Sequence, residues 1–253
     1  MAEFLLRVPD HLGDGVMAIP AVQSIARLGA VTVVGPPWAK RLYALEESTT
    51  TNPDTAVLFK PSFSAAWRHR HIQRRVGIPG DWRRWLLTDV VKPSIKHRIH
   101  TYTAIAATVG AESSPYPSFS PSSYEKNRSP TLSAADVLLL PISKSQATVG
   151  WMEFRALADA LGERAIFAAG PGECEALRAI AGPHRCLPPL GIGEFAAAAI
   201  QATAVVGNDS GLSHLASAAR RSAGIDPAST HVIFGSTDHQ TTGPIGCTPH
   251  RLD

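Results

Sequence analysis

An isolated carboxylate between two glycines stands close to the start of the chain. Asp14 lies in the stretch VPDHLGDGVMAIPAV, residues 8–22, which follows a short apolar run at residues 4–6. A carboxylate on a loop that faces a ligand can act as a general base and accept a proton from a hydroxyl group. The same side chain can instead cap a helix that starts near Val16. Both roles, which can coexist, therefore stay open for Asp14.

A second candidate site lies in the motif VVGNDSGLSHLASAA at residues 205–219. The pattern predicts a strand that ends at Gly207, a short polar turn, and a helix that begins near Leu212. Backbone N–H groups at such a helix start bind phosphate, because they have no intrahelical acceptor and lie at the positive end of the helix dipole. The alternative is an ordinary Asp or Ser cap followed by a surface histidine. The candidate anion-binding residues are Asp209, Ser210, Gly211, Leu212 and His214.

Arginine and tryptophan side chains crowd into residues 67–85. Guanidinium groups suit bidentate contact with phosphate, and indole rings suit the apolar face of a sugar or a lipid interface. The segment therefore indicates a site for an anionic acceptor, and the alternative is an ordinary solvated face. Nucleic acid ranks below both, because the formal net charge is only +3 and no nucleic-acid-binding motif is present. The residues are Arg68, His69, Arg70, His71, Arg74, Arg75, Arg83 and Arg84, with Trp67, Trp82 and Trp85.

Strand and helix patterns alternate along both halves of the chain. Apolar runs predict strands at residues 4–8, 31–34, 56–59, 136–140, 165–169, 203–207 and 231–234. Helical spacing predicts helices at residues 16–28, 40–45, 152–161, 173–180, 193–201 and from residue 212 onward. The alternation is typical of α/β proteins with parallel sheets, in which ligands collect at the carboxyl ends of the strands.

Residues 111–131, AESSPYPSFSPSSYEKNRSPT, are rich in serine and proline. We expect no helix or inner strand in this stretch, because proline cannot donate a backbone hydrogen bond. We interpret it as the connection between two Rossmann-like domains, and the alternative is a surface loop within one domain.

The composition favours a globular protein without a metal centre. A chain of 253 residues fits one large domain or two small ones, and no apolar run approaches the roughly 20 residues that cross a bilayer. Acidic residues precede any long apolar segment, so we expect no signal peptide and a cytoplasmic protein. The three cysteines are widely spaced and no H-E-x-x-H motif occurs, which argues against a disulfide framework and a zinc site.

Several stretches, taken in order, resemble the heptosyltransferases of glycosyltransferase family 9. NDSGLSHLASA followed by VIFGSTDHQTTGPIG resembles the family's carboxyl half, and RVPDHLGDGVMAIPAVQSI resembles its opening loop. KPSFSAAWRHRHIQRRVGIPGDWRRWLLTD is most similar to the heptosyltransferase II branch. AGPGECEALRAIAG and LGIGEFAAAAIQATAVVGNDSG also follow the family pattern, so the resemblance covers most of the chain.

The resemblance implies an α/β GT-B fold, with two Rossmann-like domains facing across a cleft. Residues 1–120 would bind the acceptor and residues 121–253 the nucleotide sugar. The implied reaction is inverting, metal-independent and cofactor-free transfer of heptose, or a related sugar, from an ADP-sugar to an anionic lipopolysaccharide core. Asp14 would be the base, and the enzyme would contact the inner membrane peripherally. The implied acceptor-binding residues are His11, Gly13, Arg68, Arg74, Arg75 and Arg83.

The chain departs from the family pattern at two places. The family segment P-G-A-x-x-G-P-A-K-R-W carries a lysine that meets the donor phosphates, whereas PISKSQATVGW has Val149 at that position. Ser143 and Lys144 lie on the same loop and are the candidate replacements. The C-terminus is also expected to be shortened. A catalytically impaired nucleotide-sugar-binding homologue is therefore the alternative function.

Overall fold

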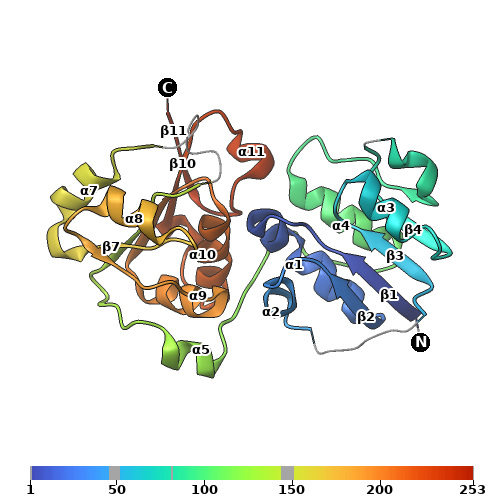
Figure 1. Ribbon diagram of the computed structural model, residues 1–253, viewed down its shortest axis with the longest axis horizontal. Helices are drawn as coiled ribbons and strands as arrows, with labels where there is room; N and C mark the ends of the chain where they lie inside the picture. The colour runs from blue at the N-terminus through green and yellow to red at the C-terminus, as the bar shows by residue number, and fades with distance from the viewer. Residues whose placement is uncertain (1, 46–51, 81, 144–150, 253) are drawn as a thin grey trace. The chain divides into compact units, whose positions relative to one another are not determined.

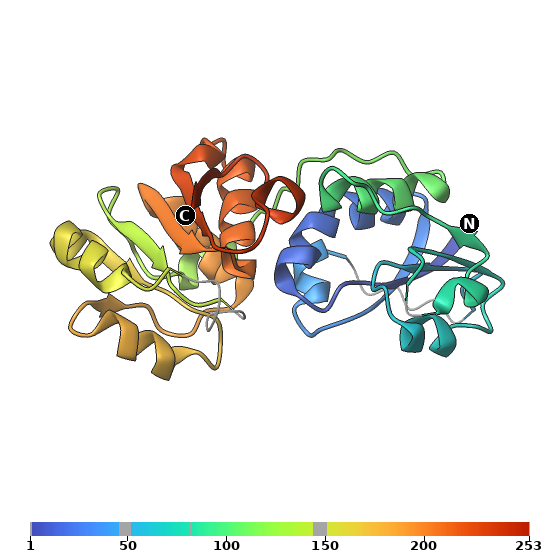
Figure 2. The ribbon, with the colours of Figure 1, turned by 90° about the horizontal axis from the view of Figure 1, so that it is seen from above.

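The computed structural model describes residues 2–45, 52–80, 82–143 and 151–252. The chain divides into two compact units, Met1–Pro117 and Ser118–Asp253, close to the boundary expected at residue 120. Each unit is a sheet with helices packed along it (Figures 1 and 2). None of the described helices is long and apolar enough to cross a membrane.

The first unit has a five-stranded sheet in the order β2-β1-β3-β4-β5, and every strand pair in it is parallel. All four residues of β3 are buried, as expected for an inner strand covered on both faces. Helices α1 and α4 pack against each other. The strands are β1 (Ala2–Arg7), β2 (Gly29–Val34), β3 (Thr55–Leu58), β4 (Arg74–Gly77) and β5 (Asp89–Val90). The helices are α1 (Leu12–Ala26), α2 (Ala39–Tyr43), α3 (Phe63–Arg68), the 3-10 helix η1 (Arg83–Leu86) and α4 (Arg98–Thr108).

The second unit has a six-stranded sheet in the order β11-β10-β9-β6-β7-β8, again with parallel pairs. Its strands are β6 (Val137–Leu140), β7 (Ala165–Phe167), β8 (Arg185–Cys186), β9 (Ala204–Asn208), β10 (Thr230–Phe234) and β11 (Thr248–Arg251). Its helices are α5 (Ser123–Arg128), α7 (Phe154–Leu161), α8 (Cys174–Ala181), α9 (Ile192–Gln201), α10 (Gly211–Ser222) and α11 (His239–Thr242). Two 3-10 turns, η2 (Gly162–Arg164) and η3 (Pro227–Ser229), precede β7 and β10.

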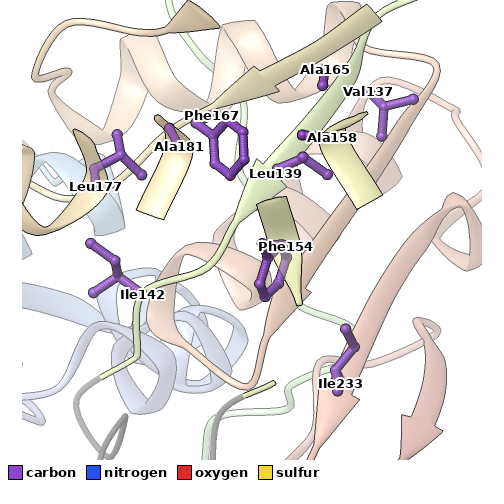
Figure 3. Close-up of a cluster of buried hydrophobic side chains, with 10 residues drawn as sticks. All are labelled: Val137, Leu139, Ile142, Phe154, Ala158, Ala165, Phe167, Leu177, Ala181 and Ile233. Atoms are coloured by element: carbon purple, nitrogen blue, oxygen red, sulfur yellow. The ribbon is translucent and has the colours of Figure 1, made fainter. Parts of the chain in front are cut away.

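One hydrophobic cluster of the second unit lies where α7 and α8 cover the sheet. Phe154 from α7, Leu177 from α8, and Leu139 and Phe167 from the strands are buried in one cluster (Figure 3). Burial of such side chains is the main favourable contribution to the stability of the unit. Because burial holds these strands in place, it also fixes the positions of the loops that follow their carboxyl ends.

Helix α1 begins earlier than the sequence pattern predicts. It starts at Leu12 instead of near Val16, with His11 as the extended N-cap, so Asp14 lies in the first turn and is not the cap. A Cβ atom on Gly15 would lie 2.6 Å from the Trp38 ring. Gly15 is therefore needed for packing of the indole against the helix.

The serine- and proline-rich stretch contains a helix that we did not expect. Helix α5 starts with a capping box, in which the Ser122 side chain accepts from the Glu125 N–H and the Glu125 carboxylate accepts from the Ser122 N–H. The S-x-x-E spacing was a sequence signal for this helix start. The prediction was wrong because the prolines flank the six helical residues and do not interrupt them.

The strands β4, β5, β8 and β11 were also missed. Each has only two to four residues. Two of the four residues of β4 are arginines, so its apolar pattern is too short to predict a strand. Parallel pairing with β3 stabilises this strand, and that pairing is a tertiary feature.

We expect Gly207→Ala to lower the free energy of unfolding by about 1–3 kcal/mol, because overpacking forces neighbouring groups apart. A Cβ atom there would lie 2.7 Å from Ser213 Oγ and 2.8 Å from Leu140 Cβ. The control is Gly80→Ala, where the nearest atom is the Pro61 carbonyl oxygen at 3.9 Å. Thermal and denaturant unfolding measure both. Equal effects of the two substitutions would contradict the close packing of β9 against β6 and α10.

Candidate functional site

The Asn208 side chain joins two loops at the carboxyl end of β9. Its Nδ2 donates to the carbonyl oxygens of Pro141 (2.7 Å) and Trp151 (3.2 Å), and its Oδ1 accepts from the Trp151 N–H (2.9 Å). The side chain is 1% exposed. Asn208 therefore holds both ends of the segment that connects β6 to α7. Ser143 lies on this segment and is buried, whereas Lys144 and Val149 lie outside the described residues.

The start of α10 follows immediately. Ser210 is its extended N-cap, and the Ser210 Oγ accepts from the Ser213 N–H at 3.4 Å. The Ser213 hydroxyl donates to the Asn208 carbonyl oxygen at 2.7 Å. The helix begins at Gly211, one residue before the predicted start. The N–H groups of Gly211 and Leu212 have no intrahelical acceptor, so this turn is suited to an anion.

The Asp209 carboxylate lies beside this turn but is turned toward the following loops. Its Oδ2 accepts from the Thr237 hydroxyl (2.9 Å), and its Oδ1 lies 3.9 Å from His214 Nε2. Burial and then the Asp209 charge raise the pKa of the Cys247 thiol to about 12. His214 is 5% exposed, so it is neither a surface histidine nor a solvent-facing group. Asp209 and His214 thus lie against each other beneath the helix start.

A pocket of about 260 Å³ opens in the second unit near the carboxyl ends of β7 and β8. The carboxyl ends of parallel strands share one edge of a sheet, so the pocket and the start of α10 lie along the same edge. None of the residues predicted to bind the donor lines it, and no sequence motif indicated it. Its lining residues are Cys174, Leu177, Arg178, Cys186, Leu187, Pro188 and Pro189.

In the first unit, Asp14 lies among one guanidinium and two phenol groups. Its Oδ1 accepts from Arg98 Nη1 at 2.7 Å, and 17% of the Asp14 side chain is exposed. Burial, and then the negative charge of Asp14, raise the pKa of both Tyr43 and Tyr102. The Tyr43 hydroxyl is buried and has no hydrogen-bond partner within the described parts of the chain. Sequence reasoning missed Tyr43, Arg98 and Tyr102, because only the packing of α2 and α4 against α1 brings them to Asp14.

Arg83 is the one predicted acceptor residue that is fully buried. Its side chain has no exposed surface. Its guanidinium donates to the carbonyl oxygens of Ile78 (2.7 Å), Lys60 (2.5 Å) and Leu58 (3.4 Å). The arginine therefore stabilises the fold of this region, and we remove it from the set that could meet an acceptor.

Arg74 and Arg75 are also tied to the first unit. Arg74 donates to both carboxylate oxygens of Asp89 (3.1 and 3.3 Å) and to the Thr108 carbonyl oxygen (2.8 Å). Arg75 donates to the Leu86 carbonyl oxygen at 2.6 Å. These bonds show that neither side chain is simply solvated. Both are half-buried, so part of each side chain is still exposed.

Arg68, His11 and Gly13 complete the predicted acceptor set. Arg68 is exposed at the end of α3, and His11 is exposed at the N-cap of α1. Gly13 is half-buried in the first turn of α1, next to Asp14.

Residues 45–249 match the family model described as Glycosyltransferase family 9 (heptosyltransferase). The chain belongs to glycosyltransferase family 9. It is therefore a glycosyltransferase, and its two units are the two Rossmann-like units of the GT-B fold. A search among curated proteins found no match.

Solved structures of the family share this fold. E. coli ADP-heptose lps heptosyltransferase II is 18% identical, with a TM-score of 0.79 over 99% of this chain and 90% of that one. A glycosyl transferase family 9 protein from Veillonella parvula is 15% identical, with a TM-score of 0.76 over 99% and 85%. E. coli heptosyltransferase WaaC, solved with ADP, is 16% identical, with a TM-score of 0.69 over 99% and 93%. At these identities the likeness shows the fold.

We expect Asn208→Ala to lower the free energy of unfolding of this glycosyltransferase by about 2–4 kcal/mol, because buried carbonyl groups lose their donors. The control is Asn127→Ala on the exposed face of α5, where the change should stay within about 0.5 kcal/mol. Denaturant unfolding measures both variants. A loss at Asn208 no larger than at Asn127 would show that the loop ends are held by other contacts.

Proposed function

We propose that this enzyme transfers heptose from ADP-heptose to the phosphorylated inner core of lipopolysaccharide, with inversion and without a metal ion. The start of α10 at the end of β9 carries the proposal, because it combines an anion-binding turn with the residues expected at the donor site. Support also comes from the related WaaC structures, one with ADP and one with ADP-2-deoxy-2-fluoro heptose.

On the donor side, the diphosphate would accept hydrogen bonds from the N–H groups of Gly211 and Leu212. Ser210 is the N-cap of this turn, and the Asp209 carboxylate lies next to His214 beside it. Donors aimed at the leaving diphosphate stabilise the negative charge that grows in the transition state, which is the task a metal would otherwise perform. Ser143 and Lys144 are proposed to complete the phosphate contacts from the neighbouring loop.

The pocket beside β8 is proposed to hold the nucleoside part of the donor. It lies at the same edge of the sheet as the start of α10, and its lining combines apolar and polar surface with one cationic side chain, Arg178. Small-molecule sites commonly combine an apolar cavity with a few polar groups that fix orientation.

On the acceptor side, Asp14 would take the proton of the attacking hydroxyl group. The oxygen then bonds to the anomeric carbon of heptose, and the bond to the phosphate oxygen breaks with departure of ADP. Arg98 fixes the Asp14 carboxylate in the first turn of α1, and the exposed fraction of that carboxylate leaves room for a hydroxyl group. His11, Gly13, Arg68, Arg74 and Arg75 are proposed to contact the anionic acceptor.

Asp14→Asn should lower turnover by about 10² to 10⁴, the usual effect of removing a general base. It should leave ADP affinity unchanged, because Asp14 is not a donor-site residue. The loss of the partly exposed pair with Arg98 should cost less than about 1 kcal/mol of stability.

The matched control is Asp10→Asn, four residues earlier. The Asp10 carboxylate pairs with Arg7 and Lys60, and these partners hold its pKa below the ordinary value although burial opposes them. Its turnover should stay within a few-fold of the parent. If Asp14→Asn transfers sugar at the parental rate, the base lies elsewhere. If the parent binds ADP-heptose but transfers nothing, the protein is a catalytically impaired nucleotide-sugar-binding homologue.

A second prediction tests the donor site by charge. Leu212→Asp puts a carboxylate at the second position of α10, where the helix dipole favours it, so folding should not suffer. The same carboxylate repels the diphosphate, and we expect ADP affinity to fall on the order of 100-fold in calorimetric titration. Tyr124→Asp, at the second position of α5, is the control and should leave ADP affinity unchanged. Parental affinity in Leu212→Asp would place the diphosphate elsewhere.

A further inference from the structure

Two histidine rings meet on the outermost pair of strands of the second unit. His231 comes from β10 and His250 from β11, the last strand in the order of the six-stranded sheet (Figure 1). In the parallel register His231 pairs with Thr248, and His250 lies two residues further along β11, so both side chains project from the same face. The two histidines are 19 positions apart in the sequence, and no spacing pattern indicated them. We call them the histidine pair.

The facing nitrogens of the histidine pair have the separation of two ligands on one metal ion. His231 Nδ1 lies 3.1 Å from His250 Nε2, the ring centroids are 5.3 Å apart, and the ring planes differ by 33°. A metal ion binds imidazole nitrogen at about 2.0–2.1 Å. Two such nitrogens, at an angle between the square-planar and the tetrahedral value, lie roughly 2.9–3.4 Å apart. Both nitrogens could therefore bind one ion with little change in position.

The same two nitrogens can instead share a hydrogen bond. One neutral ring then donates its N–H to the lone pair of the other ring, and the tautomer decides which ring is the donor. Metal binding needs a lone pair on both facing nitrogens. The donating ring provides it by taking its other tautomer, in which the proton sits on the far nitrogen. The histidine pair therefore holds either a proton or a metal ion between its nitrogens, and titration with metal tells the two states apart.

The histidine pair is accessible from solvent and supplies part of a coordination sphere. His250 is exposed, and His231 is half-buried. Among the described residues, no group of three or more His, Cys, Asp and Glu side chains is placed to hold a metal ion, so the pair would give two ligands and water the others. Imidazole nitrogen suits Zn²⁺, Cu²⁺ and Ni²⁺, whereas Mg²⁺ and Ca²⁺ prefer oxygen ligands. The chemistry of the pair thus selects a transition-metal ion.

We propose that His231 and His250 bind one divalent transition-metal ion of the Zn²⁺, Cu²⁺ and Ni²⁺ class, with water completing the coordination. The ion would tie β11 to β10, and β11 is a strand of four residues, three of them exposed. The segment 235–247 joins the two strands, and its Thr237 hydroxyl donates to the Asp209 carboxylate. A bound ion would therefore stabilise the edge of the sheet and hold both ends of this segment. It takes no part in sugar transfer, because His231 is the second residue of β10, away from the carboxyl ends of the strands.

Calorimetric titration of the full, reduced chain with Zn²⁺ tests the site. We expect saturable binding of one ion per chain by the parent, without competition from Mg²⁺. His231→Gln and His250→Gln should each weaken binding on the order of 100-fold, because the remaining imidazole loses the advantage of a second ligand held in place. The matched control is His71→Gln with His100→Gln, which removes two exposed histidines of the first unit and should bind Zn²⁺ as the parent does.

Two further measurements report on the ligands and on the strands. With Cu²⁺ at one equivalent, electron paramagnetic resonance should show two bound nitrogens in the parent and one in each single variant, while the control variant keeps the parental spectrum. Zn²⁺ should raise the temperature of thermal unfolding of the parent, because an ion that binds only the folded chain stabilises it. The same concentration of Zn²⁺ should leave both single variants nearly unchanged.

Two results would overturn the metal site. Parental Zn²⁺ affinity in both His231→Gln and His250→Gln would place the ion elsewhere, and its loss in Cys174→Ser would locate it at the thiols of the pocket beside β8. Absence of saturable binding by the parent would show that the histidine pair forms a hydrogen bond only. None of these measurements uses sugar transfer, so their outcome is independent of the proposed function.

Discussion

The hydrogen bonds of one buried amide hold the candidate donor site together. Asn208 satisfies the carbonyl oxygens of Pro141 and Trp151 and the Trp151 N–H, at the point where β9 ends and α10 begins. An asparagine side chain offers two donors and one acceptor group in a single plane, so it can replace the backbone pairing that these loop ends lack. Its neighbour Gly207 lets β6 and the Ser213 hydroxyl come close. Ser210 and Gly211, which belong to the predicted donor site, follow this junction directly in the chain.

Buried arginines serve the same purpose elsewhere in the chain. Arg220 on α10 is 2% exposed and donates to the carbonyl oxygens of Ala199, Ala202 and Thr203 around the end of α9. Burial lowers its pKa, yet a guanidinium stays charged at neutral pH and favours the negative end of a helix. Arg83 joins α3 and η1 in the same manner. A guanidinium has five donors in a rigid fork, so one arginine can bind several carbonyl groups. Within one basic segment, Arg83 is therefore buried and stabilises the fold, whereas the next residue, Arg84, is exposed.

The environment of Asp14 shows how a site depends on packing between helices. The carboxylate comes from the first turn of α1, its cationic partner Arg98 from the start of α4, and Tyr43 from the end of α2. The helix dipole also favours a carboxylate in this turn. A residue placed in this way has a fixed position before any substrate arrives, and preorganised groups of this kind are what electrostatic catalysis requires.

The amino-acid sequence determined the fold class, most of the longer helices and inner strands, and the motif around residues 207–214, because those features depend on local periodicity and turn chemistry. It indicated Asp14 and the helix start near Leu212 as candidates. Only the tertiary structure decided that α1 begins at Leu12 and that β4 is a strand, whereas the S-x-x-E spacing before α5 was a local signal that the prediction overlooked. The tertiary structure also separated buried Arg83 from exposed Arg68 and brought Arg98 to Asp14. The physical reason is that burial, pairing between strands and contacts between distant helices depend on which segments meet in space, and that information is absent from the spacing of residues along one segment.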